Sequence, residues 1–301
     1  MRIALTGATG LVGRRCIERF RNDGHTIRAW FRGQNAPAVE GVDWVPGELD
    51  DPAAATRIVQ GCDAVVHTAL SRHDASFMAE PQDPVAYFQT NVVGSLRLFE
   101  AAKIANVARF VFISSGAVHE KVAEDLSLNE QHPLWPASLY GSSKASVETL
   151  VHAYGLSGKL NAATLRPVSI VGLDNPVSKS KWYSLVQGVV NSEAVDVSGG
   201  SKVVYVDELV SAIDAVLNSD HPIAGETFNV CSGFVSHHQI ATVTKQVSGS
   251  TSELVGEPKS PGRRMETDKL QRLGVKLGSE DWLEQHVKKL VDAVRISSNA
   301  R

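Results

Sequence analysis

Short apolar stretches alternate with segments of helical spacing through the first half of the chain. Four stretches rich in β-branched, apolar or aromatic residues, at positions 2–5, 26–30, 64–67 and 109–114, predict buried strands. Between them, the segments 11–23, 52–60 and 86–105 repeat apolar residues at the period of a helix. This alternation favours right-handed βαβ units that form a parallel sheet with helices on both faces. The predicted fold class is α/β.

The regular alternation ends after a predicted helix at 140–154 and a predicted strand at 162–166. Residues 172–201 mix Gly, Pro, Ser and Lys around one helical piece at 182–190. Strands at 203–206 and 227–230 and a helix at 207–218 follow, and Ser236 to Gln239 resemble a capping box that opens a helix ending near 247. We therefore predict a main domain of residues 1–168, rejoined by 203–231, and a small C-terminal lobe of residues 169–202 and 232–301.

Composition narrows the classes of partner and location. The formal net charge is −3, so no basic excess exists to neutralise phosphates, and neither nucleic acid nor a membrane surface is an expected partner. Cys16, Cys62 and Cys231 are far apart and odd in number, which predicts neither a disulfide framework nor a metal site. No apolar run approaches the ~20 residues needed to cross a bilayer, and no signal-peptide pattern is visible. We expect a cytoplasmic protein.

A glycine-rich segment, Thr6-Gly-Ala-Thr-Gly-Leu-Val-Gly13, joins the first predicted strand to the first predicted helix. Gly7 would permit a tight turn, Gly10 would let the backbone approach a pyrophosphate, and Gly13 would let the helix pack closely on the strand. The helix N-terminus would offer free N–H groups to the phosphates. The residues expected to contact the cofactor here are Gly7, Thr9, Gly10, Leu11, Val12 and Gly13. This context predicts a Rossmann-type doubly wound parallel sheet that binds a dinucleotide, and assigns substrate binding to the small lobe.

The end of the second predicted strand indicates which dinucleotide binds. NAD-binding proteins usually place a carboxylate there to hold the ribose 2′-hydroxyl. This chain instead reads Trp30-Phe-Arg-Gly33, without an acid. Arg32 has the permanent charge and fork geometry suited to a 2′-phosphate, and Arg14, just past the third glycine, can assist it. We predict NADP as the cofactor, with NAD as the alternative.

Tyr140 and Lys144 are four residues apart and therefore share one face of the predicted helix. A tyrosine with a pKa near ~10 needs roughly 4 kcal/mol of differential stabilisation to act at neutral pH, and a nearby ammonium group would favour the phenolate. Ser114 and Ser115 end the predicted strand that precedes this helix. Active sites of open α/β sheets lie beyond the carboxyl ends of the strands, so a serine there can bind the oxygen that Tyr140 protonates or deprotonates.

These motifs together resemble the extended short-chain dehydrogenase/reductase family, also called the NAD-dependent epimerase/dehydratase family. The similarity runs in order along most of the chain. It includes the glycine turn at 6–13 and the segments Gly-Glu-Leu-Asp at 47–50, Val-His-Thr-Ala at 66–69, Asn-Val-Val-Gly at 91–94, Phe-Ile-Ser-Ser at 112–115, Tyr-Gly-Ser-Ser-Lys at 140–144, Leu-Arg-Pro at 165–167 and Val-Asp-Glu at 206–208. The pattern is closest to the dihydroflavonol-reductase-like branch.

The resemblance implies roles for individual residues. Ser115 would orient the substrate, Tyr140 would be the acid/base, and Lys144 would bind the nicotinamide ribose and lower the pKa of the tyrosine. Asn91 would brace the site, although a helix-capping role explains this residue equally well. The other positions implied to contact the cofactor are Glu48 and Leu49 beside the adenine, and Thr68, Ala69, Leu70, Ser114 and Pro167.

Departures from the family pattern narrow the chemistry. Dehydratases of the family carry an acidic pair just after the catalytic hydroxyl, where this chain has Gly116 and Ala117, so dehydration is not expected. The segment between Arg166 and Asp207 is short, which favours a small substrate. We therefore predict an NAD(P)-dependent reductase or dehydrogenase that transfers hydride between the nicotinamide and a carbonyl or secondary alcohol.

Two other functions remain open. A nucleotide-sugar epimerase would use the same residues with a tightly held cofactor, and Arg263 and Arg264 could clamp the diphosphate of its substrate. A non-catalytic dinucleotide sensor is the third alternative, but such proteins generally lack the Tyr and Lys pair. His67, at the end of a predicted buried strand, is interpreted as a packed core residue rather than a catalyst. We expect no bound metal.

The two long predicted helices, 86–105 and 140–154, commonly form a four-helix interface in this family. A homodimer with an isologous contact is therefore expected. Leu96, Leu98, Val147 and Leu150 could face either the sheet or the partner.

Overall fold

The computed structural model describes residues 1–72, 78–279 and 281–299. The chain forms two units. Unit 1 consists of Met1–Pro167, Leu209–Val230 and Glu266–Val275, and unit 2 consists of Val168–Glu208, Cys231–Met265 and Lys276–Arg301. Relative to the boundaries proposed from the sequence, residues 168, 203–208 and 231 belong to unit 2 and residues 266–275 to unit 1.

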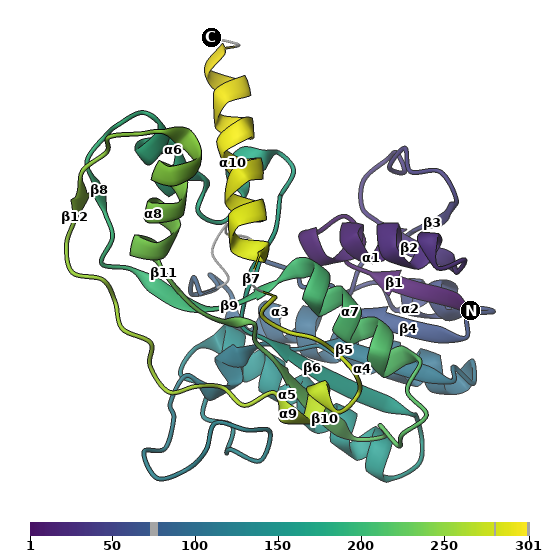
Figure 1. Cartoon of the computed structure of the whole chain (residues 1–301). Helices are drawn as coiled ribbons and strands as arrows, with labels where there is room; N and C mark the ends of the chain where they lie inside the picture. Colours follow the sequence, from purple (N-terminus) through teal and green to yellow (C-terminus); the bar gives the residue numbers. More distant parts are fainter. Residues whose placement is uncertain (73–77, 280, 300–301) are drawn as a thin grey trace. The chain divides into compact units, whose positions relative to one another are not determined.

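A seven-stranded sheet forms the centre of unit 1, in the order β10-β6-β5-β4-β1-β2-β3 (Figure 1). All of its neighbouring strands are parallel. The strands are β1 (Arg2–Thr6), β2 (Thr26–Phe31), β3 (Val42–Pro46), β4 (Ala64–His67), β5 (Arg109–Ile113), β6 (Ala162–Pro167) and β10 (Glu226–Val230). This is the doubly wound parallel sheet predicted from the alternating pattern, because sheets covered on both faces require apolar strands.

Helices cover both faces of this sheet (Figure 1). On one face, α2 (Pro52–Val59), α4 (Gly94–Ile104) and α5 (Leu139–Leu156) pack against a shared apolar core. On the other lie α1 (Leu11–Asn22) and α7 (Val206–Leu217). The remaining helical segments of unit 1 are α3 (Pro84–Phe88), the π-helical turn η1 (Gln89–Val93), the 3₁₀ turn η2 (Gly116–His119) and α9 (Asp268–Gln271).

Short polar side chains fix where several of these helices begin. Asp51, Asp83 and Ser138 each accept a hydrogen bond from a backbone N–H in the first turn of α2, α3 and α5 respectively. Such caps satisfy donors that have no partner inside the helix. The cap at Ser138 therefore sets the start of the helix that carries the predicted tyrosine and lysine.

Three features of unit 1 differ from the prediction or settle what it left open. Strand β3 was not predicted, because it is a five-residue edge strand whose apolar pattern is broken by Asp43 and Pro46. The helix predicted at 86–105 is interrupted by the π-helical turn η1. Leu98 and Val147 are buried in the core of unit 1 and so cannot face a partner chain. The homodimer itself stays a prediction.

Unit 2 contains a three-stranded sheet in the order β11-β9-β7 and a layer of three helices. The sheet consists of β7 (Ser169–Val171), β9 (Gly200–Tyr205) and β11 (Gly233–Ser236), and two short strands, β8 (Val195–Asp196) and β12 (Leu254–Val255), pair separately. The helical segments are η3 (Val177–Lys179), α6 (Tyr183–Val190), α8 (His237–Ser248) and α10 (Trp282–Asn299).

The predicted capping box at the start of α8 is present, with Ser236 and Gln239 bonded reciprocally. Helix α10 was not predicted, although its buried residues recur at helical spacing: Val287, Leu290, Val291 and Val294. Within the described ranges, no helix is long and apolar enough to cross a membrane. The role of unit 2 in substrate binding stays a prediction.

Candidate active site

The glycine-rich turn lies between β1 and α1, as predicted. Gly7 has φ of 70°, and a Cβ atom there would lie 2.4 Å from Thr68 Oγ1. A Cβ atom at Gly13 would lie 2.3 Å from the Gly7 carbonyl oxygen, so the helix start packs directly on the turn. At Gly10 the nearest atom is that same oxygen, at 3.3 Å, and no other described neighbour lies within 4 Å. Internal packing thus explains Gly7 and Gly13, whereas Gly10 leaves open space at the helix start.

That open space lies at the N-terminus of α1, where Gly10 supplies no side-chain cap. Arg14 folds back from the first turn of α1, and its Nη1 donates to the Thr9 carbonyl at 2.8 Å. Arg32 directly follows β2 and is exposed. An uncapped helix N-terminus, a close-packed glycine turn and these arginines fit the phosphates of a dinucleotide. The residues present therefore match the group that the sequence predicts.

Two further segments of the predicted cofactor site follow β3 and β4. Glu48 is exposed, whereas Leu49 is buried and its carbonyl oxygen would lie 2.4 Å from a Cβ atom at Gly94, the first residue of α4. Thr68 Oγ1 donates to the Thr6 carbonyl at 2.7 Å. Thr68, Ala69 and Leu70 are half-buried, and the first two lie directly beside Gly7.

Asn91 fastens the segment after β4 to η1. Its Oδ1 accepts from the Ser71 backbone N–H at 2.8 Å, and its Nδ2 donates to the Ser71 and Tyr87 carbonyls, each at 3.0 Å. Asn91 lies within η1 rather than at the start of a helix, so the capping alternative does not describe it. The Asn91 side chain therefore links the backbone at Ser71 to the backbone at Tyr87, which is the bracing role expected of it.

Ser115 and Tyr140 meet at the carboxyl end of β5. Ser115 Oγ accepts from the Ala117 N–H at 3.1 Å, which caps η2, and also forms a hydrogen bond with the Tyr140 hydroxyl. A Cβ atom at Gly141 would lie 2.5 Å from the Ala117 carbonyl oxygen, so α5 packs directly on η2. Ser114 is buried, and its Oγ has no hydrogen-bond partner among the described residues.

The pKa of Tyr140 is shifted in the direction opposite to that expected from Lys144. Burial raises the pKa of this phenol, and the hydrogen bond from Ser115 and the charge of Arg72 lower it only in part. Sequence reasoning missed the desolvation, because burial of a residue at a helix start is a tertiary property. Further positive charge at the site would be needed to favour the phenolate.

Lys144 is buried beneath the site and bonded to the strand before Ser115. Its Nζ donates to the Ile113 carbonyl at 2.8 Å and lies 4.8 Å from the centre of the Phe112 ring. Burial lowers the pKa of Lys144 to about 8, and the negative charge of Glu148, one turn further along α5, opposes this shift. Lys144 is therefore mostly protonated at neutral pH.

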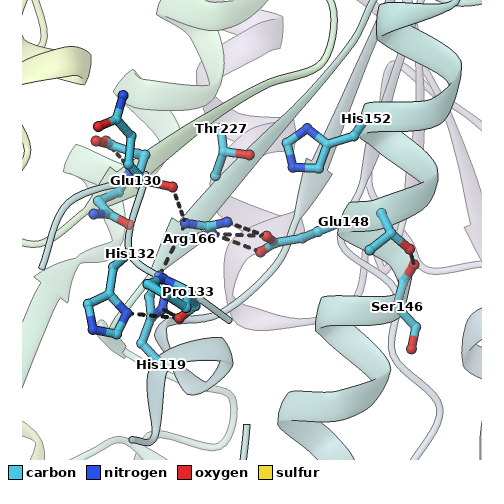
Figure 2. Close-up of polar contacts among 12 residues, drawn as sticks. His119, Glu130, His132, Pro133, Ser146, Glu148, His152, Arg166 and Thr227 are labelled. Atoms are coloured by element: carbon cyan, nitrogen blue, oxygen red, sulfur yellow. Dashed lines mark hydrogen bonds and ion pairs between the residues drawn. The ribbon is translucent and has the colours of Figure 1, made fainter. Parts of the chain in front are cut away.

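A buried ion pair behind the site was missed by sequence reasoning (Figure 2). The side chains of Arg166 in β6 and Glu148 in α5 are 2% and 0% exposed, and Arg166 Nη2 lies 2.7 Å from Glu148 Oε2. Arg166 Nε also donates to both carboxylate oxygens, and its Nη1 donates to the Glu130 carbonyl and to His119 Nε2. An arginine within an apolar strand was the available signal. Pro167, the next residue, is buried at the end of β6.

His119 at the end of η2 completes this network as a neutral ring. Its Nδ1 lies 3.1 Å from the Pro133 carbonyl, which can only accept, so Nδ1 carries the proton and Nε2 accepts from Arg166. Burial and the neighbouring Arg166 charge lower the pKa of His119 to about 4. Arg166 thereby connects η2, which follows Ser115, to the helix that carries Tyr140.

Arg263 and Arg264 are exposed residues of unit 2. No group of three or more His, Cys, Asp or Glu side chains that could hold a metal occurs in the part of the chain that the structure describes.

Comparison with known proteins identifies the family of the chain and several relatives. The NAD dependent epimerase/dehydratase family matches residues 3–231. The chain is 26% identical over 276 residues to the UDP-glucose 4-epimerase of Mycolicibacterium smegmatis, covering 87% of this chain and 85% of that protein. It is 29% identical over 181 residues to the 2-alkyl-3-oxoalkanoate reductase of Shewanella oneidensis, covering 57% of this chain and 45% of the reductase.

Solved structures share the fold. The crystal structure of a UDP-glucose 4-epimerase from Thermotoga maritima with UDP-glucose has a TM-score of 0.80 and 21% identity, and the similarity covers 99% of this chain and 100% of that one. These comparisons establish the family without singling out its dihydroflavonol-reductase-like branch.

Proposed function

Because the chain belongs to the NAD-dependent epimerase/dehydratase family, we propose that it is a nucleotide-sugar epimerase that inverts one hydroxyl-bearing carbon. The observation that carries this proposal is the extent of the similarity to the Mycolicibacterium smegmatis UDP-glucose 4-epimerase. That similarity covers 87% of this chain and 85% of the epimerase, so it reaches into unit 2. The similarity to the Shewanella oneidensis reductase covers only 45% of the reductase.

The chemistry of the site agrees with an epimerase. Tyr140 Oη, hydrogen-bonded to Ser115, would take the proton of the sugar hydroxyl and later return it. The chemistry supplied by a bound nicotinamide would be the removal of hydride from the same carbon and its return. Gly116 and Ala117 provide no further acid or base, so loss of water by a dehydratase route is not supported.

Lys144 and Ser114 would support the cofactor and substrate side of this reaction. The Lys144 ammonium group is held by the Ile113 carbonyl within β5, which leaves its other two protons available to a ribose. The unpartnered Ser114 hydroxyl at the end of the same strand is a further donor in this region. The positive charge of the oxidised nicotinamide would favour the Tyr140 phenolate, which burial alone disfavours.

The test is to incubate the purified protein with UDP-glucose, UDP-N-acetylglucosamine, dTDP-glucose and GDP-mannose, and to separate the products by anion-exchange chromatography. We expect an epimer to form without net change in the absorbance of reduced nicotinamide. When the reaction is run in D₂O, the product should carry no deuterium on the inverted carbon, because a transferred hydride does not exchange with solvent.

The control is Tyr140→Phe, which should form no epimer while still binding the dinucleotide. The proposal would be abandoned if no sugar in the panel gave an epimer, or if the inverted carbon gained deuterium. Deuterium there would mean that a proton, rather than a hydride, is removed.

A reductase acting on a small carbonyl compound is the second candidate. It is favoured by Arg32 and by the absence of a carboxylate at the end of β2, since NADP commonly serves reductions. This function requires stoichiometric consumption of NADPH, which the absorbance measurement above separates from epimerisation.

A further inference from the structure

A continuous chain of hydrogen bonds runs through the buried ring of His67 at the end of β4. On one side, the Ala69 N–H donates to Thr6 Oγ1 at 3.2 Å, and Thr6 Oγ1 lies 2.7 Å from His67 Nδ1. On the other side, His67 Nε2 lies 2.9 Å from Ser95 Oγ, and the Ser95 hydroxyl donates to the Asn91 carbonyl at 2.5 Å. His67, Thr6 and Ser95 are all nearly inaccessible to solvent.

The donors and acceptors along this chain fix the tautomer of His67. The Asn91 carbonyl can only accept, so the single hydroxyl proton of Ser95 is used there. Ser95 Oγ must then accept from His67, which places the ring proton on Nε2. In the neutral ring Nδ1 therefore accepts from the Thr6 hydroxyl, which in turn accepts from Ala69. Every hydrogen-bonding atom named in this run, from the Ala69 N–H to the Asn91 carbonyl, therefore has a partner.

The surroundings of His67 keep the ring neutral. The centre of its ring lies 5.5 Å from the centre of the Phe112 ring, and the ring packs edge-to-face with Phe110. Burial, with a smaller contribution from the charge of Lys144, lowers the pKa of His67 to about 3. The ring is thus a fixed hydrogen-bond connector at neutral pH, and it is not available to exchange protons with a substrate.

Both ends of the chain reach the same short segment, residues 69–71. One end bonds directly to Ala69 through Thr6, which closes β1 just before the glycine turn. The other end reaches Asn91, whose side chain bonds the Ser71 backbone in both directions. The segment is therefore held at two points, by Thr6 and by Asn91. His67 connects these two residues through the interior of unit 1, directly to Thr6 and through Ser95 to Asn91.

We propose that His67 is a positioning residue of the dinucleotide site, which fixes residues 69–71 against the glycine turn through Thr6 and against η1 through Ser95 and Asn91. This role rests on the dinucleotide site of the proposed function and extends it to Thr6, His67 and Ser95, which are not among the predicted cofactor contacts. It also gives His67 a role beyond that of a packed core side chain.

The tautomer is tested without any substrate. In ¹⁵N-labelled protein freed of nucleotide, long-range ¹H–¹⁵N correlation should show a protonated, pyrrole-like Nε2 and an unprotonated, pyridine-like Nδ1 for His67 at neutral pH. His67→Phe identifies the signals by their loss. A protonated Nδ1 would overturn the proposal, because the bond from Thr6 could not then run in the stated direction.

The positioning role is tested by calorimetric titration of NADH and NADPH into wild type, His67→Phe, Thr6→Val and Ser95→Ala. Each variant removes a different link, and we expect the dinucleotide Kd to rise on the order of tenfold, as for one or two lost hydrogen bonds. His67→Gln retains a donor near Nε2 and should recover part of the affinity. The control is Thr244→Val on α8, which removes a buried hydroxyl that donates to the Ile240 carbonyl at 2.7 Å. Ser95 makes the same kind of bond, from its hydroxyl to the carbonyl four residues earlier.

The outcomes separate this proposal from the proposed function. A wild-type protein that binds neither dinucleotide would refute the cofactor site, and this role with it. Normal binding by wild type with unchanged affinity in His67→Phe and Thr6→Val would refute the role of His67 alone. An equal loss in Thr244→Val would show that the effect is one of general stability, and would likewise refute it.

Discussion

Replacing Arg166 with methionine should destabilise unit 1 far more than removing a surface charge. The Arg166 and Glu148 side chains are 2% and 0% exposed, and Arg166 Nη2 and Nε donate to the carboxylate at 2.7, 2.9 and 3.1 Å. Arg166→Met would leave this carboxylate buried without a cation. Removing one partner of a buried pair costs about 3–5 kcal/mol, which corresponds to a change of roughly two to three and a half powers of ten in the unfolding constant.

A double variant separates the loss of the pair from the loss of packing. Replacing a buried ion pair by apolar residues of similar volume is often neutral, so Arg166→Met combined with Glu148→Leu should regain most of the stability. The recovery should be incomplete, because His119 Nε2 and the Glu130 carbonyl lose their donor in both variants. The matched control is Lys288→Met, which removes an exposed ion pair. The side chains of Lys288 and its partner Glu284 are 54% and 55% exposed, so this change should lower the free energy of unfolding by no more than about 1 kcal/mol.

Urea unfolding followed by circular dichroism measures the loss in each variant. Because the chain has two units, amide hydrogen exchange in α5 and β6 should be measured as well, to assign the loss to unit 1. The reasoning is refuted if Arg166→Met unfolds at the same urea concentration as Lys288→Met. It is also refuted if the double variant is no more stable than the single one.

Three further predictions concern chemistry, cofactor choice and pH. Tyr140→Phe should lower turnover by about 10²–10⁴-fold with little change in dinucleotide Kd, and Ser115→Ala should lower it less; steady-state kinetics and titration calorimetry check both. Arg32→Ala should weaken NADP binding by roughly ten- to a hundredfold, the value of a lost charge-assisted bond, and leave NAD binding unchanged; equal losses for both would contradict the assignment. Burial lowers the folded-state pKa values of His119 and His286 to about 4, from an ordinary value of 6.5. The unfolded chain therefore binds protons before the folded chain does, and the free energy of unfolding should fall as the pH drops from about 6.5 to about 4. His286→Phe should make this fall shallower in urea titrations at several pH values, because it removes one of the two rings whose pKa is lowered by burial.

The sheet and the glycine turn could be predicted from the sequence because each depends on local pattern, and the meeting of Ser115 with Tyr140 could be predicted because the family resemblance implied it. Apolar runs and helical spacing mark the strands and helices, and the carboxyl ends of parallel strands share one edge of a sheet. Strand β3 escaped prediction because an edge strand need not be apolar on both faces. Helix α10 has the spacing of a helix in its buried residues, so the sequence did carry the signal for it.

The polar networks behind the site could not be predicted, because they join residues distant in sequence. Arg166 and Glu148 are 18 positions apart, Thr6 and His67 are 61 apart, and His67 and Ser95 are 28 apart. A single sequence does not report such pairings. The direction of the Tyr140 pKa shift escaped for the same reason, since it depends on how deeply the surrounding elements bury the phenol.

The two networks differ from Ser115 and Tyr140 in what their loss should change. Tyr140 and Ser115 act at the reacting oxygen, so their variants should lower turnover without weakening the dinucleotide. His67 and its partners hold a segment beside the glycine turn, so their variants should weaken the dinucleotide first. Arg166 links η2 to α5 through His119 and Glu148, so its loss should lower the stability of unit 1 most and lower turnover only in proportion to that loss. Measuring Kd, turnover and unfolding on the same set of variants distinguishes these three roles, because each predicts a different one of the three quantities to change most.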